Sequence, residues 1–318
     1  MGEPKINYPL VNDAIRKNLE NIIIKKVFSN GYIFYGPVGI GKKETALQFI
    51  YSIFKQYSSS SKIEEKINKN NHPDFLYIEP THLIKGKLIN RSESELSNNK
   101  EIIRIDQIRF IKKFLSQKSI ESEKKIVLID DAHLLNEASS NCLLKTLEEP
   151  TNGIFILLTS NINKILNTII SRCQLVRFKS YSSQELKVFM KNNFDFAKYK
   201  EDKELDIQYL INSSSGSPGK LIDNLKILDA IPEEIQRSLE LPITDYLKIL
   251  QTSKLISEKL EINQQIFLIN FIQNKWWVKT SNPNLISKLE NLKSHLNNYV
   301  QPRLAWEVTL LNISLEDS

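Results

Sequence analysis

The sequence predicts an α/β protein in which a parallel-sheet module with a phosphate-binding loop is followed by helices alone. Two short apolar runs, Ile126–Ile129 and Ile154–Leu158, are too short for helices and are bounded by polar or breaker residues. Such runs are typical of strands buried on both faces of a parallel sheet. From about Ile231 onward there is no convincing strand, and apolar residues recur at helical spacing.

A glycine-rich loop lies between a third short strand and a helix. Residues 36–42 read GPVGIGK, which fits G-x-x-x-x-G-K, and they follow the apolar run Tyr32–Tyr35. The glycines of this loop are Gly36, Gly39 and Gly41. Glycines let successive backbone N–H groups point at phosphate oxygens, and Lys42 would reach the β- and γ-phosphates.

The residue after Lys42 departs from the pattern of an ATPase. That position normally carries Ser or Thr, whose hydroxyl binds Mg²⁺, but here it is Lys43, a cation that would repel a metal. Thr45 lies two positions on and points elsewhere on the helix. The loop therefore predicts the fold more strongly than it predicts catalysis. A loop kept only as a strand-to-helix turn is the alternative.

Polar side chains follow both buried runs. Asp130 and Asp131 come after the first, and Thr159, Ser160 and Asn161 end the second. Ligands of open α/β sheets bind beyond the carboxyl ends of the strands, so both endings should face one crevice. The helix between the two strands is expected to be capped by its preceding Asn136 and ended by Pro150.

The remaining elements follow from local patterns. In chain order we expect a helix over 11–29, a solvated polar excursion over 56–71, a proline-bounded strand over 72–80, a hairpin or loose loop over 81–100 and a helix from 103. Asp106 is placed to cap this last helix. Further on, Ser182 and Glu185 form a capping box, and a tight turn over 213–219 precedes a helix from Lys220.

Composition indicates an ordinary globular protein with room for two or three domains. Hydrophobic residues make up 41% and charged residues 25% of 318 residues, and no apolar run approaches a membrane span. The two cysteines, Cys142 and Cys173, suit a reducing cytosol, and Cys142 is expected to be a small packing residue. The four histidines lack partners at metal-ligand spacing. The net charge of +6 permits a nucleic-acid partner, but the lysines are scattered and form no dense basic block.

Several distinct segments follow one another along the chain in a characteristic order. They are GPVGIGK (36–42), HPDFLYIEP (72–80), IRIDQIR (103–109), LIDDAHLLNEASSNCLLKTLEEP (128–150), LTSN (158–161), TIISRC (168–173) and GSPGK (216–220), with a weaker QPRLAWE (301–307). Together they resemble the clamp-loader AAA+ family, most closely its delta-prime branch in bacterial DNA polymerase III. The LLKTLEEP and SRC pair is the most specific part of this resemblance.

The resemblance implies an architecture and a setting. It implies an AAA+ P-loop module (residues 1–179), a small helical lid (180–230) and an all-helical collar for oligomerisation (231–318), and these boundaries agree with the shifts in composition. It also implies a cytoplasmic ring formed with ATPase subunits (gamma/tau) and a delta subunit, which opens the sliding clamp and places it on primed DNA.

The same resemblance implies roles for the SRC residues. Arg172 would be an arginine finger that projects into the nucleotide site of a neighbouring ATPase subunit, a contribution of about 10³–10⁵ in rate. Ser171 and Cys173 would position the loop that carries it. The alternative is that Arg172 caps a helix or pairs with a local acid.

The family's nucleotide site is matched in part. Its positions fall on Gly36, Gly39, Gly41, Lys42, Lys43, Asp130, Asp131 and Asn161. Lys43 replaces the metal-binding hydroxyl, and Asp131 replaces the usual glutamate with a carboxylate one methylene short. Gly219 stands where ATPase members carry a lid arginine, for which Lys220 is a partial substitute. We therefore expect a subunit that does not hydrolyse ATP and needs no cofactor, with binding of ATP or ADP left open.

Residues 56–71 contain no cysteine, so the zinc module that many delta-prime proteins carry there is not expected. Two other functions compete with a non-hydrolysing ring subunit. Because Lys42 and Asp130 are retained, an ATP-hydrolysing motor of the gamma/tau kind, or a related helicase loader, is the first. A small-molecule P-loop kinase is the second, but the helical second half lacks an arginine-rich phosphate lid and an acceptor site.

Overall fold

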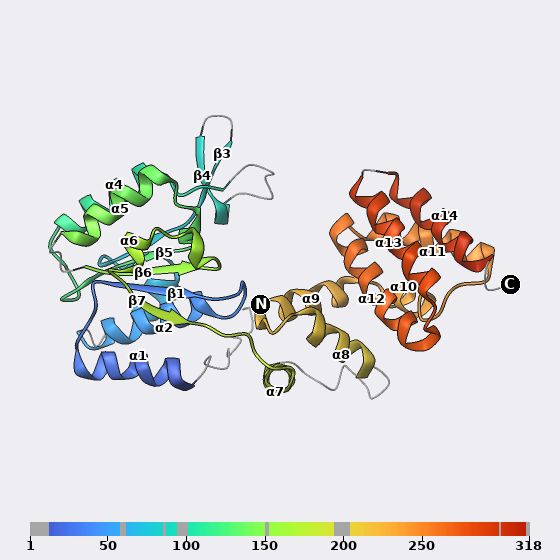
Figure 1. Ribbon diagram of the computed structural model, residues 1–318, viewed down its shortest axis with the longest axis horizontal. Coiled ribbons are helices and arrows are strands. Elements are labelled where there is room, and N and C mark those ends of the chain that lie inside the picture. The colour runs from blue at the N-terminus through green and yellow to red at the C-terminus, as the bar shows by residue number, and fades with distance from the viewer. Residues whose placement is uncertain are drawn as a thin grey trace. The chain divides into compact units, whose positions relative to one another are not determined.

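The chain folds into two compact units, residues 1–181 and 182–318 (Figure 1). The computed structural model describes residues 13–57, 62–84, 87–93, 101–149, 153–193, 204–298 and 300–315. The division into a P-loop module, a lid and a collar stays a prediction.

The first unit is built on a parallel sheet. Its elements are α1 (Asp13–Lys25), β1 (Gly31–Tyr35), α2 (Lys42–Lys55), α3 (Ile63–Asn68), β2 (Phe75–Ile78), β3 (Thr81–Ile84), β4 (Lys87–Asn90), η1 (Arg91–Glu93), α4 (Ile105–Ser116), β5 (Lys125–Ile129), η2 (Ala132–Leu134), α5 (Glu137–Glu148), β6 (Gly153–Thr159), η3 (Ile162–Lys164), α6 (Asn167–Ile170) and β7 (Gln174–Arg177). Five strands pair in the order β2-β5-β6-β1-β7, all parallel, and β3 and β4 form an antiparallel hairpin. The predicted fold class and the predicted strands are confirmed.

Both faces of this sheet are covered by helices, which explains why β5 and β6 are apolar without alternation. On β5, Ile126 and Leu128 belong to the core on the α1–α2 side, whereas Val127 and Ile129 belong to the core on the opposite side. Figure 1 shows α1 and α2 on one face and α4 and α5 on the other. Successive strand residues point to opposite faces, so a strand covered on both sides requires a continuous apolar run.

A close approach between strands determines one residue of β1. A Cβ added at Gly31 would lie 2.6 Å from the Sγ atom of Cys173, just before β7. The bulk of the Cys173 thiol therefore occupies the space that any larger residue at Gly31 would need.

The HPD segment before β2 forms a buried polar anchor. The His72 imidazole stacks on the Phe54 ring with centroids 4.1 Å apart. The Asp74 carboxylate is fully buried and accepts hydrogen bonds from three successive backbone N–H groups at 2.7–3.1 Å; they belong to Ile120, Glu121 and Ser122. The backbone carbonyl of Asp74 also accepts from Ile126 N at 2.9 Å. One residue therefore secures the loop that leads into β5 and joins β2 to that strand.

Two helix boundaries of the first unit differ from expectation. The first helix ends at Lys25 instead of continuing to 29, because Lys26 adopts a left-handed conformation with φ 53°; residues 11 and 12 lie outside the described residues. Asp106 does not cap α4. The cap is Arg104, whose N–H donates to the Gln107 side chain at 2.9 Å, and Asp106 pairs with exposed Arg109 within the first turn.

The stretch 56–71 is not wholly solvated, as far as it is described. It contains α3, whose Ile63 and Ile67 are buried in the core beside α2. Their spacing of four residues places both on one face of the helix, although the residues around them are polar. Residues 58–61 of this stretch lie outside the described part of the chain.

All regular secondary structure described in the second unit is helical, as expected. Its elements are α7 (Ser183–Asn193), α8 (Glu204–Ser213), α9 (Pro218–Ala230), α10 (Glu233–Ser238), α11 (Tyr246–Lys259), α12 (Ile262–Thr280), α13 (Pro283–Asn297) and α14 (Pro302–Ser314). The capping box is confirmed, with Ser182 N–H donating to Glu185 at 2.7 Å. α9 begins at Pro218, two residues earlier than expected, because Ser217 caps it and proline suits the first turn. None of the described helices combines the length and apolarity needed to cross a membrane.

Buried tryptophans tie the second unit together. Trp276 of α12 donates from its indole N–H to the Leu239 carbonyl at 2.9 Å. Trp306 of α14 donates to the Gln265 side chain at 3.0 Å, and Gln265 in turn donates to Leu260 O at 2.9 Å. A buried indole N–H requires such a partner. The tryptophan rings therefore fill the core, and their hydrogen bonds hold the helices in position.

Candidate functional site

The carboxyl ends of the central strands bring the predicted phosphate loop and the acidic pair to one edge of the sheet. The loop follows β1, Asp130 and Asp131 follow β5, and Thr159 ends β6. The Gly36 N–H donates to Thr159 O at 3.2 Å, so the loop begins directly beside β6. Asn161 is exposed, and its backbone N–H donates to the Thr159 hydroxyl at 3.1 Å.

The glycines of the loop have structural reasons that do not involve a ligand. A Cβ at Gly36 would lie 2.3 Å from the backbone carbonyl oxygen of Phe178, so no side chain fits there. Gly41 has φ 93° at the cap of α2, and Gly39 has φ 71°. Positive φ is costly for residues with a Cβ, so the backbone path of the loop by itself requires glycine.

The side chain of the loop lysine binds backbone carbonyls of the same loop. Lys42 Nζ donates to Gly36 O at 2.8 Å and to Pro37 O at 2.6 Å. Burial lowers the pKa of Lys42, while the charges of Asp131 and Asp130 oppose that shift. The ammonium group therefore sits inside the loop and binds its carbonyls.

A tyrosine hydroxyl links Lys43 to the acidic pair. Its Nζ lies 2.6 Å from the Tyr77 hydroxyl, 4.3 Å from the centre of that ring and 3.8 Å from Asp130 Oδ2. The Tyr77 hydroxyl donates to Asp130 Oδ2 at 2.8 Å. Burial raises the pKa of Tyr77 well above its ordinary value, with a further rise from Asp130, so the phenol stays a hydrogen-bond donor.

A residue that the sequence did not single out completes the site. Arg91, in η1 at the end of the β3–β4 hairpin, lies with Nη1 2.5 Å from Asp131 Oδ2 and Nη2 3.3 Å from Asp130 Oδ2. Its Nη1 also lies 3.5 Å from Glu101 Oε2. Burial alone would lower the pKa of Arg91, but the hydrogen bond and charge of Asp131 raise it overall. No sequence pattern marks Arg91, which lies in the stretch expected to be a hairpin or loose loop.

These residues do not fit a divalent cation. Mg²⁺ requires oxygen ligands at about 2.0–2.1 Å in near-octahedral geometry. The Thr45 hydroxyl donates to Gly41 O at 2.7 Å, Lys43 occupies the position of the usual hydroxyl, and cationic side chains of this chain lie against both carboxylates. A metal would have to displace these cations before it reached Asp130.

The SRC residues divide between surface and interior. Ser171 and Arg172 are exposed after α6, and Ser171 Oγ donates to Thr168 O at 3.0 Å. Arg172 Nη1 donates to the same carbonyl at 2.9 Å, and its Nη2 lies 2.7 Å from Glu148 Oε1. Cys173 points inward against Gly31, and burial raises its thiol pKa to about 11, which disfavours a nucleophilic role.

The remaining expected residues lie in the second unit. Gly219 and Lys220 are in the first turn of α9, where Lys220 N–H donates to the Ser217 hydroxyl at 3.2 Å. In this structure both residues take part in the start of that helix.

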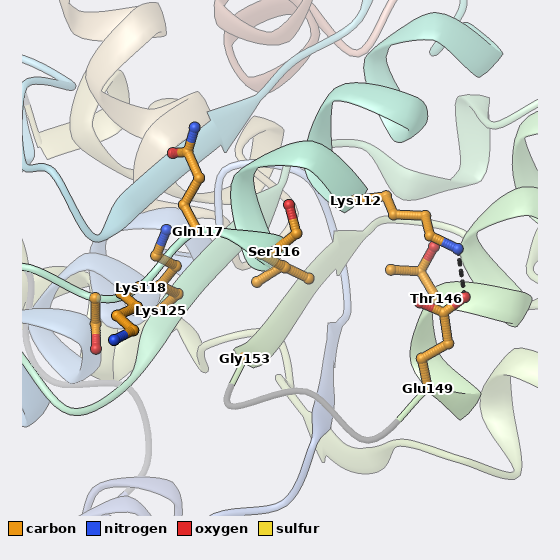
Figure 2. A pocket seen from close by; sticks show the side chains of 10 residues that line it. Lys112, Ser116, Gln117, Lys118, Lys125, Thr146, Glu149 and Gly153 are labelled. Carbon is orange, nitrogen blue, oxygen red and sulfur yellow. Dashed lines mark hydrogen bonds and ion pairs between the residues drawn. The ribbon is translucent and has the colours of Figure 1, made fainter.

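A cavity of about 530 Å³ lies at the other end of the strands, away from the phosphate loop (Figure 2). Its lining includes Lys125 and Gly153, the first residues of β5 and β6. Figure 2 shows Lys112 and Glu149 paired at one side, with Nζ and Oε1 2.5 Å apart. Lys125 Nζ donates to Phe114 O at 2.7 Å. The cavity therefore contains none of the expected site residues, and the ammonium groups of these two lysines already have partners in the chain.

Comparison with known proteins gives consistent results for both parts of the chain. Residues 11–182 match the family model described as "DNA polymerase III, delta subunit". Residues 193–313 match the model described as "Cyanobacterial DNA polymerase III delta prime, C-terminal domain". The two matches together leave only short segments of the chain unassigned.

Individual relatives share about a third of the aligned residues with this chain. The chain is 31% identical over 218 residues to DNA polymerase III subunit tau of Bacillus subtilis, which covers 68% of this chain and 36% of that protein. It is 31% identical over 171 residues to subunit delta' of the same species, covering 52% and 46%. The chain thus spans less than half the length of these relatives. A solved gamma subunit-related protein from Thermotoga maritima aligns with 95% of this chain and 99% of its own at 18% identity and a TM-score of 0.48.

Proposed function

The chain belongs to the DNA polymerase III delta subunit family, because the matched residues 11–182 make up more than half of the chain. From this premise we propose a role. The proposed role is that of a clamp-loader ring subunit of the delta-prime kind. It donates Arg172 to the nucleotide site of a neighbouring gamma/tau ATPase subunit and does not itself hydrolyse ATP. It assembles with the delta subunit and assists placement of the sliding clamp on primed DNA.

The observation that carries the proposal is the contrast between two arginines. Arg91, whose side chain is 33% exposed, is bound by three carboxylates in the chain's own site. Arg172 is 41% exposed in its side chain, and its carboxylate partner Glu148 is 47% exposed. Exposed ion pairs are worth only about 0–1 kcal/mol, so phosphate oxygens of another subunit can replace Glu148 at little cost. The exposed guanidinium is therefore available to a partner.

The chain's own site supports the second half of the proposal. Hydrolysis by P-loop proteins requires Mg²⁺ between the phosphates and a residue that orients the attacking water. Lys43 stands at the metal-binding position, and the Asp131 carboxylate is bound by Arg91. The guanidinium of Arg91 therefore occupies the carboxylate oxygen that would otherwise orient the attacking water. Both observations support a subunit that does not hydrolyse ATP.

The test is ATP turnover by the reconstituted clamp loader carrying Arg172→Ala. We expect turnover at the adjoining site to fall by about 10³-fold or more, seen as a loss of that site's share of clamp- and DNA-stimulated hydrolysis. Arg237→Ala is the matched control, because Arg237 is also exposed and pairs with one carboxylate, Glu233, at 2.6 Å. Unchanged stimulated turnover with Arg172→Ala refutes the finger.

A second variant separates the finger from a local structural role. If Arg172 serves only to pair with Glu148, then Glu148→Gln should reproduce the effect of Arg172→Ala. If Arg172 acts on a neighbour, Glu148→Gln should leave stimulated turnover within twofold of wild type. Thermal unfolding of both variants reports the structural contribution independently.

An ATP-hydrolysing motor is the alternative, favoured by the match to subunit tau over 68% of the chain and by the retained Lys42 and Asp130. It predicts that the isolated chain hydrolyses Mg·ATP and that Lys42→Ala abolishes this activity. Hydrolysis that does not depend on Lys42, or none at all, disposes of this alternative.

A further inference from the structure

Four charged side chains from three distant segments meet at the carboxyl end of β5. Lys43 comes from the first turn of α2, Arg91 from η1, and Asp130 and Asp131 follow β5 directly. These four side chains carry two positive and two negative charges. Glu101, which pairs with Arg91, and Lys42, which interacts with both aspartates, add one of each, so the formal charge stays balanced. A site that is to hold a divalent cation normally presents an excess of negative charge.

The oxygens of the acidic pair are already engaged. Asp130 Oδ2 contacts Tyr77 at 2.8 Å, Arg91 at 3.3 Å and Lys43 at 3.8 Å, and Oδ1 accepts from the Asp131 N–H at 3.0 Å. On Asp131, Oδ2 is bound by Arg91, and Oδ1 lies 3.8 Å from His133 Nδ1. Bonds from a guanidinium to a carboxylate are charge-assisted and are among the stronger protein hydrogen bonds.

Arg91 is held in place by its backbone as well as by its side chain. The Arg91 N–H donates to Pro80 O at 3.0 Å, and the next residue, Ser92, donates its hydroxyl to the Glu79 carboxylate. The base of the β3–β4 hairpin therefore fixes the origin of the guanidinium beside β5. Moving Arg91 away from the acidic pair would require rearrangement of this base.

We propose that Arg91, together with Lys43, takes the place of the divalent cation in this site, so that Asp130 and Asp131 bind no metal. The two side chains are internal counter-ions, contributed by the fold itself. This inference rests on the proposed function only in treating the loop as a former nucleotide site. It deepens that function by assigning Arg91 as the residue that determines exclusion of the metal.

Binding of Mn²⁺, a spectroscopic substitute for Mg²⁺, tests the inference on the isolated full-length chain. The amplitude of the EPR signal of free Mn²⁺ gives the amount bound to the wild type, to Asp130→Asn and to Lys43→Thr/Arg91→Gln. The matched control is Arg109→Gln/Lys112→Thr, which removes two exposed cations from α4 of the same unit and so changes the net charge equally.

We expect wild type and Asp130→Asn to bind Mn²⁺ equally, and the Lys43→Thr/Arg91→Gln variant to bind one further ion at least tenfold more tightly than the control. Adding Asp130→Asn to that variant should remove the extra ion. Mn²⁺ binding by the wild type that Asp130→Asn abolishes overturns the inference. So does a double variant with a native circular dichroism spectrum that binds no more Mn²⁺ than the control.

If the double variant does not fold, the comparison of wild type with Asp130→Asn decides alone, since binding that depends on Asp130 contradicts the inference and equal binding supports it. No partner subunit and no ATP turnover enter this measurement. Its failure would leave the role of Arg172 untouched, and failure of the Arg172→Ala test would leave the metal result untouched.

Discussion

Replacing Asp74 should destabilise the first unit more than most single substitutions do. Asp74→Ala removes a fully buried acceptor and leaves the N–H groups of residues 120–122 without their partner. A hydrogen bond to a charged group contributes about 1.5–3 kcal/mol, but Ile120 is 77% exposed, so water can replace part of the loss there. The expected loss is about 3–5 kcal/mol. Asp74→Asn, which keeps one acceptor oxygen, should lose about 2 kcal/mol.

Urea unfolding followed by far-UV circular dichroism measures this loss. The three tryptophans are Trp276, Trp277 and Trp306. All belong to the second unit, so tryptophan fluorescence follows that unit and helps to separate the two transitions. Hydrogen exchange in the peptide spanning 117–126 should rise in Asp74→Ala, because those amides lose their acceptor.

The matched control is Asp106→Ala. The Asp106 side chain is 72% exposed and pairs only with exposed Arg109 among the contacts described, so its removal should cost less than about 0.5 kcal/mol. The reasoning is refuted if Asp74→Ala costs less than about 1 kcal/mol, or if amide exchange at 120–122 is unchanged.

Three further outcomes follow from the contacts above. Gly31→Ala should cost about 1–3 kcal/mol through overlap with the Cys173 thiol, and Cys173→Ala in the same chain should recover most of it; additive losses in urea titrations would contradict this. In a Cys142→Ser variant, Cys173 should react with a disulfide reagent about 100-fold more slowly at pH 8 when native than in urea, because its pKa is about 11 against 9.0 for a free thiol. The native rate should rise about tenfold per pH unit up to about pH 11, and a flat profile would show that thiolate formation is not limiting. Gln265→Ala should destabilise the second unit by about 1–3 kcal/mol, since it leaves the Trp306 indole N–H buried without its acceptor, and an unshifted fluorescence midpoint would contradict that.

Features encoded by neighbouring residues could be predicted from the sequence. The strands around Val127 and Phe155 follow from continuous apolar runs, and the cap Asn136 follows from its position before a helix. The error at Asp106 has the same local origin, because several polar residues near the start of α4 could each serve as its cap. In the structure the Gln107 side chain accepts a hydrogen bond from the Arg104 N–H, and Asp106 is not the cap.

Arg91 marks the limit of such reasoning. It is separated by 39 and 40 residues in sequence from Asp130 and Asp131, with which it pairs. The hairpin that presents it has no turn signature strong enough to define its register from sequence. The missing hydroxyl at Lys43 predicted an impaired metal site, but the side chains that neutralise the acidic pair could be identified only from tertiary structure.

The strand order also has a consequence for synthesis of the chain on the ribosome. β1 lies between β6 and β7, and its residue Gly31 is paired with Phe155, 124 positions later (155 − 31). At about 5–20 residues added per second, β1 emerges roughly 6–25 s before its first neighbour, whereas strand pairing takes microseconds once both partners exist. Throughout that interval the nascent Tyr32, Ile33 and Phe34, all fully buried later, form an apolar segment that chaperones can bind.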